Sequence, residues 1–454
     1  MRRSVMKRAW VVLPVSLALS CVMGWPSVAA EMQQAWQVGA SAVNLRADDD
    51  MVIAGGIGPG KAQGQEGELR ATAVVLTDGP TTVAIVSCDV LMLTRDLLDP
   101  VAAEIETACG IPAAHVLIHT THTHHAPSTM RVHAYDRNEQ FCREVQRGIV
   151  QAVREAQARL TEASFCFRHA QETTVGENSR LLLADGTIYW VGSHDDRVRP
   201  TGPFDPDLPV LAFRDAAGKY LAVIFGHSTH TIGSLQPGVR SPAFYGMAAQ
   251  RMEQDLGGTF CFLQGASGST HRLEGDAADA SHRIEMAVRG ALLEAVVQEQ
   301  PALAALKRPF TFRVRQFDEQ VEDQAVTAYC NKRIGEVHGA QGVIDVFRNM
   351  RKELAAQQGQ ERSTWIQAIR IGDVAIVGVP AEFFTGLGVE IKRRSPFAHT
   401  FIAELSNDWV GYIPDREAYE LGGYQVWTGF HSYAEQGTGE RMVDTAVEML
   451  QELK

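Results

Sequence analysis

Between Ala71 and Leu160 the chain alternates short apolar runs with longer amphipathic ones, a pattern that only a few fold classes satisfy. The predicted elements of this segment are strands at Ala73–Leu76 and Thr82–Cys88, a helix at Thr94–Cys109, a strand at Val116–Ile118 and a helix at Glu139–Leu160. Such alternation is typical of α/β proteins, in which helices cover a buried sheet.

The alternation continues to the end of the chain. Later strands are expected at Ser164–His169, Thr187–Val191, Leu208–Phe213, Tyr220–Phe225, Thr259–Leu263, Phe310–Phe317, Thr364–Ile371, Val374–Val379 and His399–Leu405. Later helices are expected at Phe244–Leu256, Ala277–Gln298, Glu382–Arg393 and Glu435–Leu453, with a helical insertion near 321–358. No Pro/Ser/Gly-rich linker or internal repeat divides the sequence. We therefore expect one large α/β domain with mixed sheets over residues 31–454.

The first thirty residues have the composition of a secretory signal peptide. Four basic residues near the start precede the apolar stretch Trp10–Met23, and the small residues Ser27–Ala30 precede Glu31. The apolar stretch is too short, with these flanks, for a membrane span, and no later run approaches the required length. We expect cleavage after Ala30 and a secreted or periplasmic mature protein.

Charge and cysteine content exclude some classes of function. The leader carries four basic residues and no acidic one, so its removal changes the formal net charge from −12 to −16. A surface this acidic argues against nucleic acid as a partner. No C-x-x-C pair is present, which argues against a zinc ribbon. Cys88 and Cys261 lie in apolar strands, and export leaves a disulfide among the other mature cysteines open.

Histidines at the end of a predicted strand are the first candidate functional residues. The stretch His115–Pro127 reads HVLIHTTHTHHAP and contains His119, His122, His124 and His125 within seven residues. On extended backbone, residues two apart share a face, so His122 and His124 are predicted to point the same way. Imidazole is a common metal ligand. The alternatives are a metal site, completed by ligands from elsewhere, and a polar loop whose histidines face water.

Two further candidates follow buried strands in the same manner. His227 comes directly after a buried strand and His230 lies three residues later, so only one of them is expected to join His122. We choose His227 because it is nearer to the strand. Glu382 follows the apolar strand at Val374–Val379 and would supply negative charge to a metal site. Alternatively, Glu382 complements the dipole at the start of a helix.

The loop Gln264–Ser269 lies between a predicted strand and a helix. Its backbone amides could form an anion site, and it approaches the G-x-S-x-G nucleophile pattern around Ser267. Because Ser269 stands where that pattern requires a glycine, a serine hydrolase fits less well than a plain turn.

The histidine stretch also carries a family resemblance. T-H-T-H-H-A-P at Thr121–Pro127 resembles the T-H-T-H-S-G-P signature of the neutral and alkaline non-lysosomal ceramidase family, whose members are zinc amidases that cleave N-acyl sphingosines. Further blocks match in the same order, at Val38–Ala40, Val86–Asp89, Phe225–Thr229, Ser241–Gly246, Val379–Phe383, Asn407–Pro414 and Glu420–Thr428. The resemblance spans roughly residues 36 to 450 and implies the N-terminal catalytic domain of that family.

Site residues follow from the resemblance block by block. It implies Zn²⁺ as cofactor, with the ligands His122, His227, Glu382 and Tyr424. It implies that His124 lies next to the metal ligands without being one of them, and that Arg180 faces the substrate. Our hypothesis for the mechanism is that Tyr424 shares the oxyanion charge with zinc and that His124 transfers the proton to the leaving amine. Tyr424 is implied by the resemblance alone, because phenolate is a rare ligand. Where the family has a serine near the metal, this chain has Thr270-His271.

The implied function is that of an exported zinc-dependent amidohydrolase. Zinc-activated water would attack the N-acyl (amide) bond of a lipid such as ceramide. One alternative is a metal hydrolase of the same fold that acts on a non-lipid substrate, such as an N-acyl or carbohydrate derivative. Another is a non-catalytic exported metal-binding protein.

Overall fold

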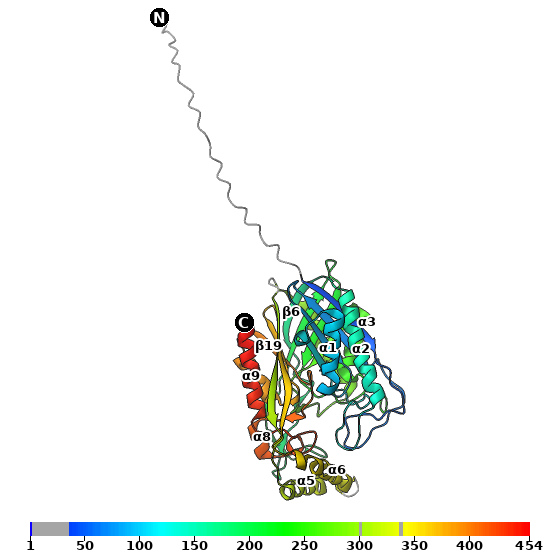
Figure 1. Ribbon diagram of the computed structural model, residues 1–454, viewed down its shortest axis with the longest axis vertical. Helices are drawn as coiled ribbons and strands as arrows, with labels where there is room; N and C mark the ends of the chain where they lie inside the picture. Colours follow the sequence, from blue (N-terminus) through cyan, green and yellow to red (C-terminus); the bar gives the residue numbers. More distant parts are fainter. Residues whose placement is uncertain (2–35, 299–301, 336–338) are drawn as a thin grey trace. The chain divides into compact units, whose positions relative to one another are not determined.

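The protein is described here by a computed structural model, which covers Met1 and residues 36–298, 302–335 and 339–454 (Figure 1). The predicted signal peptide lies outside the described residues except for Met1. From Trp36 onward the chain contains three larger sheets, and a pair of helices covers the outer face of each.

The first sheet has the strand order β4-β3-β2-β1-β5. Its strands are β1 Gln37–Asn44, β2 Arg70–Thr77, β3 Thr82–Cys88, β4 Val116–Thr120 and β5 Thr161–Glu162. The helices α1 Arg95–Cys109 and α2 Glu139–Ala158 pack side by side over it (Figure 1). Strand β3 is buried on both faces, because Ile85 points to the interior of the domain and Val86 points to the helices.

The second sheet has the order β12-β11-β10-β6-β14. Its strands are β6 Ser164–Gln171, β10 Asp207–Arg214, β11 Tyr220–His227, β12 Thr259–Gln264 and β14 Val296–Val297. The helices α3 Ala243–Leu256 and α4 Ala277–Glu294 cover its outer face.

The third sheet has the order β15-β16-β17-β19. Its strands are β15 Leu303–Arg313, β16 Glu361–Ile371, β17 Val374–Gly378 and β19 His399–Ala403. The helices α7 Thr385–Arg394 and α9 Thr438–Leu453 pack against this sheet, and α9 runs along it in Figure 1.

One apolar core fills the space between the three sheets. It contains Val38, Ile85 and Leu117 from the first sheet, Phe213, Ile224 and Leu263 from the second, and Ile369, Ile376 and Phe401 from the third. The three sheets therefore bury their inner faces against one another, as the mixed α/β prediction requires. The prediction of this fold class is confirmed.

Each sheet contains one parallel pair of strands, and the carboxyl ends of these pairs meet. The pairs are β3 with β4, β11 with β12, and β17 with β19. His119 joins all three ends, because its Nε2 accepts from the Gln264 amide at 2.8 Å and its Nδ1 donates to the Glu404 carbonyl at 2.6 Å. Burial lowers the pKa of His119 to about 3, so this imidazole is neutral and structural.

The remaining elements are short or lie at the periphery. They are α5 Glu319–Arg333, α6 Ala340–Leu354, α8 Arg416–Leu421, the 3-10 turns Ala113–His115, Ala355–Gln357 and Tyr424–Val426, and the strand pairs β7 Glu177–Asn178 with β13 Thr270–His271, β8 Leu181–Leu183 with β9 Arg197–Pro200, and β18 Glu382–Phe383 with β20 Tyr412–Ile413. The predicted helical insertion is the pair α5 and α6, at the lower end of Figure 1.

Two local predictions are wrong. Thr187–Val191 is a loop in which Ile188 makes only an isolated bridge to Leu182. Glu382 does not begin a helix, because its amide donates to the Gly411 carbonyl at 3.1 Å and the following helix starts at Thr385.

Two remaining sequence expectations concern membranes and cysteines. Among the described helices, none has both the length and the apolar character that crossing a membrane requires. The six cysteines of the described residues are all unpaired.

Candidate metal centre

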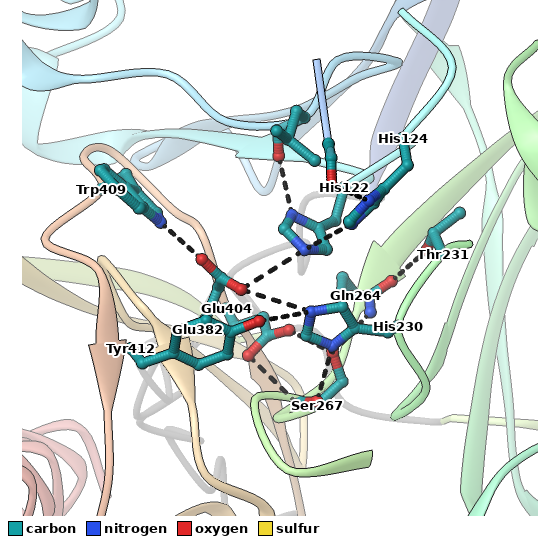
Figure 2. Close-up of polar contacts among 12 residues, drawn as sticks. His122, His124, His230, Thr231, Gln264, Ser267, Glu382, Glu404, Trp409 and Tyr412 are labelled. Atoms are coloured by element: carbon teal, nitrogen blue, oxygen red, sulfur yellow. Dashed lines mark hydrogen bonds and ion pairs between the residues drawn. The ribbon is translucent and has the colours of Figure 1, made fainter. Parts of the chain in front are cut away.

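Three histidines and a glutamate meet at the point where the carboxyl ends of the three sheets converge (Figure 2). His122 and His124 follow β4, His230 follows β11, and Glu382 lies in β18 just after β17. We call these four residues the His3Glu cluster. His122 has a φ of 60°, so the chain turns sharply at this position.

The hydrogen bonds of the three imidazoles fix their tautomers. Nδ1 of His122 lies 3.0 Å from the Leu91 carbonyl, Nδ1 of His124 lies 3.1 Å from the Gly55 carbonyl, and Nδ1 of His230 lies 2.9 Å from the Ser267 carbonyl. Because a carbonyl only accepts, each Nδ1 carries the proton and each Nε2 presents a lone pair. A histidine that ligates a metal through Nε2 has this arrangement.

Three distances between atoms of the cluster are close to those within a coordination sphere. The two Nε2 atoms of His122 and His124 are 3.3 Å apart. Oε2 of Glu382 lies 3.6 Å from Nε2 of His122 and 3.3 Å from Nε2 of His230. Ligand atoms around tetrahedral zinc, at bond lengths of about 2.0–2.1 Å, are about 3.3–3.4 Å apart. The donor set therefore fits a divalent transition-metal ion.

Burial of the cluster favours a bound cation. Glu382 is 3% exposed, and its Oε1 accepts a hydrogen bond from the Trp409 indole at 3.0 Å. Burial, with a further contribution from neighbouring imidazoles, holds the pKa values of His122 and His124 well below their usual range. Neither ring is then an imidazolium that could neutralise the carboxylate. A positive ion between them would stabilise the adjacent lone pairs and the buried carboxylate.

A small cavity borders the cluster. It has a volume of about 30 Å³ and is lined by residues that include His122, Glu382, Tyr412 and Tyr424. A volume of this size holds an ion or a water molecule. The site thus has room beside the protein ligand atoms.

Two tyrosines lie at this small cavity. The Tyr412 hydroxyl is 3.2 Å from Nε2 of His230, and the Tyr424 hydroxyl is 3.2 Å from Nε2 of His133. Burial, and secondarily the charge of Glu382, raises the pKa of both phenols well above the usual value. Nδ1 of His133 lies 3.2 Å from the Gly56 carbonyl, so Nε2 of this ring is an acceptor and Tyr424 donates to it.

Comparison with solved structures identifies the architecture. The structure of neutral ceramidase from Pseudomonas aeruginosa matches with a TM-score of 0.70 and 18% sequence identity, over 92% of this chain and 75% of the ceramidase. A ceramidase structure described as a complex with C2 matches with a TM-score of 0.71, at the same identity and coverage. The chain has the neutral ceramidase fold. No protein-family model matches the sequence, and no curated relative matches it.

The ceramidase fold agrees with the fold that the sequence resemblance implied. The structure brings His122 and Glu382 together, and it places His124 beside them as a further ligand atom at 3.3 Å from His122. Tyr424 lies on the wall of the same small cavity, but its hydroxyl is bonded to His133.

His227 lies apart from the cluster. Its Nδ1 is 2.6 Å from the Tyr245 hydroxyl and its Nε2 is 3.1 Å from the Glu172 carbonyl, so both ring nitrogens already have partners. His230, three residues later, faces Glu382 instead. Our choice of the histidine nearer to the strand is therefore corrected: β11 continues through His227, and the loop after it turns His230 toward β4.

Arg180 is buried behind the turn that carries Tyr424. Its guanidinium donates to Gln425 Oε1 at 2.9 Å and to the Gly422 carbonyl at 2.7 Å, and it packs over the Phe384 ring. It is 1% exposed and is absent from the residues that line the cavities at the cluster. In place of facing a substrate, Arg180 supports the Tyr424 turn.

A larger cavity of about 310 Å³ opens beside the cluster. His124, His230, Tyr412 and Tyr424 form part of its wall. The Trp190 ring stacks on the Tyr424 ring at 4.5 Å with an angle of 2° and extends this wall as an apolar surface. A molecule in this cavity lies directly against the His3Glu cluster.

Sequence reasoning missed His133, and it considered Trp409 and Tyr412 only as aromatic residues that line a substrate channel or belong to the core, without a role at the metal centre. Trp409 and Tyr412 lie within the block Asn407–Pro414 that carries the resemblance, so that block was their signal. For His133 the sequence offers no signal, because its role depends on contacts with Gly56 and Tyr424, 77 and 291 residues away.

Proposed function

We propose that this protein is a metal-dependent amide hydrolase of the neutral ceramidase type, with Zn²⁺ held by His122, His124, His230 and Glu382. The observation that carries the proposal is the set of three unprotonated Nε2 atoms and one carboxylate oxygen, in which His124 and His230 line a substrate-sized cavity. The comparison with ceramidase structures supports the choice of an amide as the bond that is cleaved.

A zinc ion bound to these residues would polarise a carbonyl group and lower the pKa of a bound water to about 7. Hydrolysis then transfers the water oxygen to the acyl carbon, breaks the C–N bond and delivers a proton to the nitrogen. Glu382 is the carboxylate of the cluster, and its side chain is our candidate for holding the water proton in transit.

Tyr412 is our candidate for stabilising the oxyanion. Its hydroxyl is 3.2 Å from Nε2 of His230, and it becomes free to donate to a substrate oxygen once that nitrogen binds a cation. We infer a more distant role for Tyr424, because coordination by this phenol would require its hydroxyl to leave His133. His124 joins the ligands in our proposal and is not assigned a separate proton transfer.

The chemical class of the substrate is an N-acyl compound. The similarity to ceramidase structures favours a lipid amide such as ceramide, and the apolar wall formed by Trp190 and Tyr424 suits an acyl chain. A non-lipid N-acyl or carbohydrate derivative is the alternative substrate. The residues 1–30 have the composition of a secretory leader, so we propose that the enzyme acts outside the cytoplasm.

One observation favours a non-catalytic metal-binding protein. Four protein side chains could complete the sphere of a zinc ion and leave no position for water. The cavity of about 30 Å³ beside the cluster argues for an additional position.

Measuring metal content and turnover together tests the proposal. The purified protein should contain one equivalent of zinc and should release fatty acid from a short-chain ceramide or from N-acyl amino compounds. His122→Ala should lose both properties. Stoichiometric zinc without hydrolysis of any of these amides would support the binding protein, and full activity of His122→Ala would refute both readings.

A further inference from the structure

Arg272 lies on the wall of the cavity of about 310 Å³. Of the described residues that line this cavity, it is the only one whose side chain is permanently charged. It follows His271, whose ring lies 4.1 Å from the His230 ring and is bonded through Nδ1 to the Ser179 hydroxyl at 2.5 Å. Arg272 thus follows, in the chain, a histidine whose ring contacts His230 of the cluster.

The guanidinium is anchored without being neutralised. Its Nη1 donates to the carbonyls of Glu274 and Gly275, and its Nη2 donates weakly to the carbonyl of Ile232 at 3.5 Å. These carbonyls fix the position of the group but bring no negative charge. Its Nε is buried and has no partner among the described residues.

The acidic residues around Arg272 are engaged elsewhere. No carboxylate of the described chain forms an ion pair with Arg272. Asp279 pairs with Arg283 at 2.7 Å, and Asp276 accepts from the Asp279 amide at the start of α4 at 2.7 Å. Burial lowers the pKa of Arg272, and the more distant charges of Asp276 and Asp279 offset only part of this effect. A guanidinium without an ion-pair partner beside a reaction site is suited to bind a carboxylate.

We propose that the substrate of this enzyme is an N-acyl amino acid, whose carboxylate pairs with Arg272 while its amide carbonyl lies at the His3Glu cluster. The acyl chain would then lie along Trp190. Water is added across the amide C–N bond, so the products are the fatty acid and the free amino acid, with no oxidation or reduction. A ceramide has no charged group for Arg272. This inference rests on the proposed function and specifies its substrate.

The test compares matched substrates. N-octanoylglycine carries the carboxylate that Arg272 would bind, and its methyl ester replaces this charge by a neutral group. We expect the wild-type protein to prefer the acid in kcat/KM, and Arg272→Gln to reduce this preference about 10- to 100-fold, since a hydrogen bond to a charged group contributes about 1.5–3 kcal/mol. Arg272→Lys should retain part of it. The control is Arg147→Gln, on the exposed face of α2, which makes the same change of charge outside the cavity. This variant should retain the full preference for the acid.

A binding measurement separates this inference from the proposed function. N-(octylsulfonyl)glycine has no amide carbon to attack, and its binding can be followed by quenching of tryptophan fluorescence. Binding of this acid in preference to its ester, lost in Arg272→Gln, supports anion recognition even if no amide is hydrolysed. Equal binding of acid and ester, or an unchanged preference in Arg272→Gln, overturns the inference even if the protein hydrolyses amides.

Discussion

Replacing His230 by glutamine tests the geometry of the metal centre against the prediction made from the sequence. Nε2 of His230 lies 3.3 Å from Glu382 Oε2, whereas both nitrogens of His227 are bonded to other groups. His230→Gln should therefore weaken zinc binding, and His227→Gln should not.

The size of the effect follows from linkage between binding and folding. A ligand at 100 times its Kd stabilises the folded state by about 2.7 kcal/mol. If loss of one ligand weakens zinc binding about 100-fold, the stabilisation at the same zinc concentration falls to about 0.4 kcal/mol. The zinc-dependent part of the stability of His230→Gln should thus nearly disappear.

His227→Gln provides the matched control. This substitution disturbs buried hydrogen bonds to Tyr245 and Glu172, so we expect a loss of about 1–3 kcal/mol in the free energy of unfolding. That loss should be equal with and without zinc, because the residue does not face the cluster. Both variants can be compared by thermal unfolding with zinc and with a chelator, alongside metal analysis. The reasoning is refuted if His227→Gln loses zinc and His230→Gln keeps it.

Three further predictions concern neighbouring residues. Trp409→Phe removes the hydrogen bond to Glu382 Oε1 and should weaken zinc binding about 10- to 100-fold in a competition assay with a chelator; unchanged affinity would contradict the role of the indole. Tyr412→Phe should lower kcat about 100- to 1000-fold in steady-state assays while zinc content is unchanged, and normal turnover would exclude Tyr412 as the oxyanion donor. Burial raises the pKa of Asp89 to about 7, so the folded state holds a proton there that the unfolded state releases near pH 4. The contribution of Asp89 to stability is therefore lost as the pH rises through 7. Urea unfolding at several pH values should show that the free energy of unfolding of Asp89→Asn increases relative to that of the wild type between pH 5 and pH 7.5. A difference that does not change with pH would contradict this.

The fold class could be predicted from the sequence because the order of apolar and polar residues along each segment reflects which of its faces are buried. Strand β3 has the predicted ends, Thr82 and Cys88, since a strand covered on both faces is a continuous apolar run between polar turns. Helix α1 begins one residue later than predicted and ends at Cys109 as expected.

The composition of the site could be predicted only in part. His122, His124 and Glu382 directly follow buried strands, or lie close to their ends, so their direction depends on local geometry. The choice between His227 and His230 depends on the path of a loop, which is fixed by distant contacts such as the bond of His230 Nδ1 to the Ser267 carbonyl. The conformation of such a loop is not contained in the periodicity of the sequence.

Anomalous diffraction at the zinc absorption edge, from crystals of the purified protein, measures most directly whether residues from three sheets hold one cation. We predict a single strong peak bounded by His122, His124, His230 and Glu382. A peak beside His227, or no peak in a protein that hydrolyses amides and is insensitive to chelators, would contradict the account.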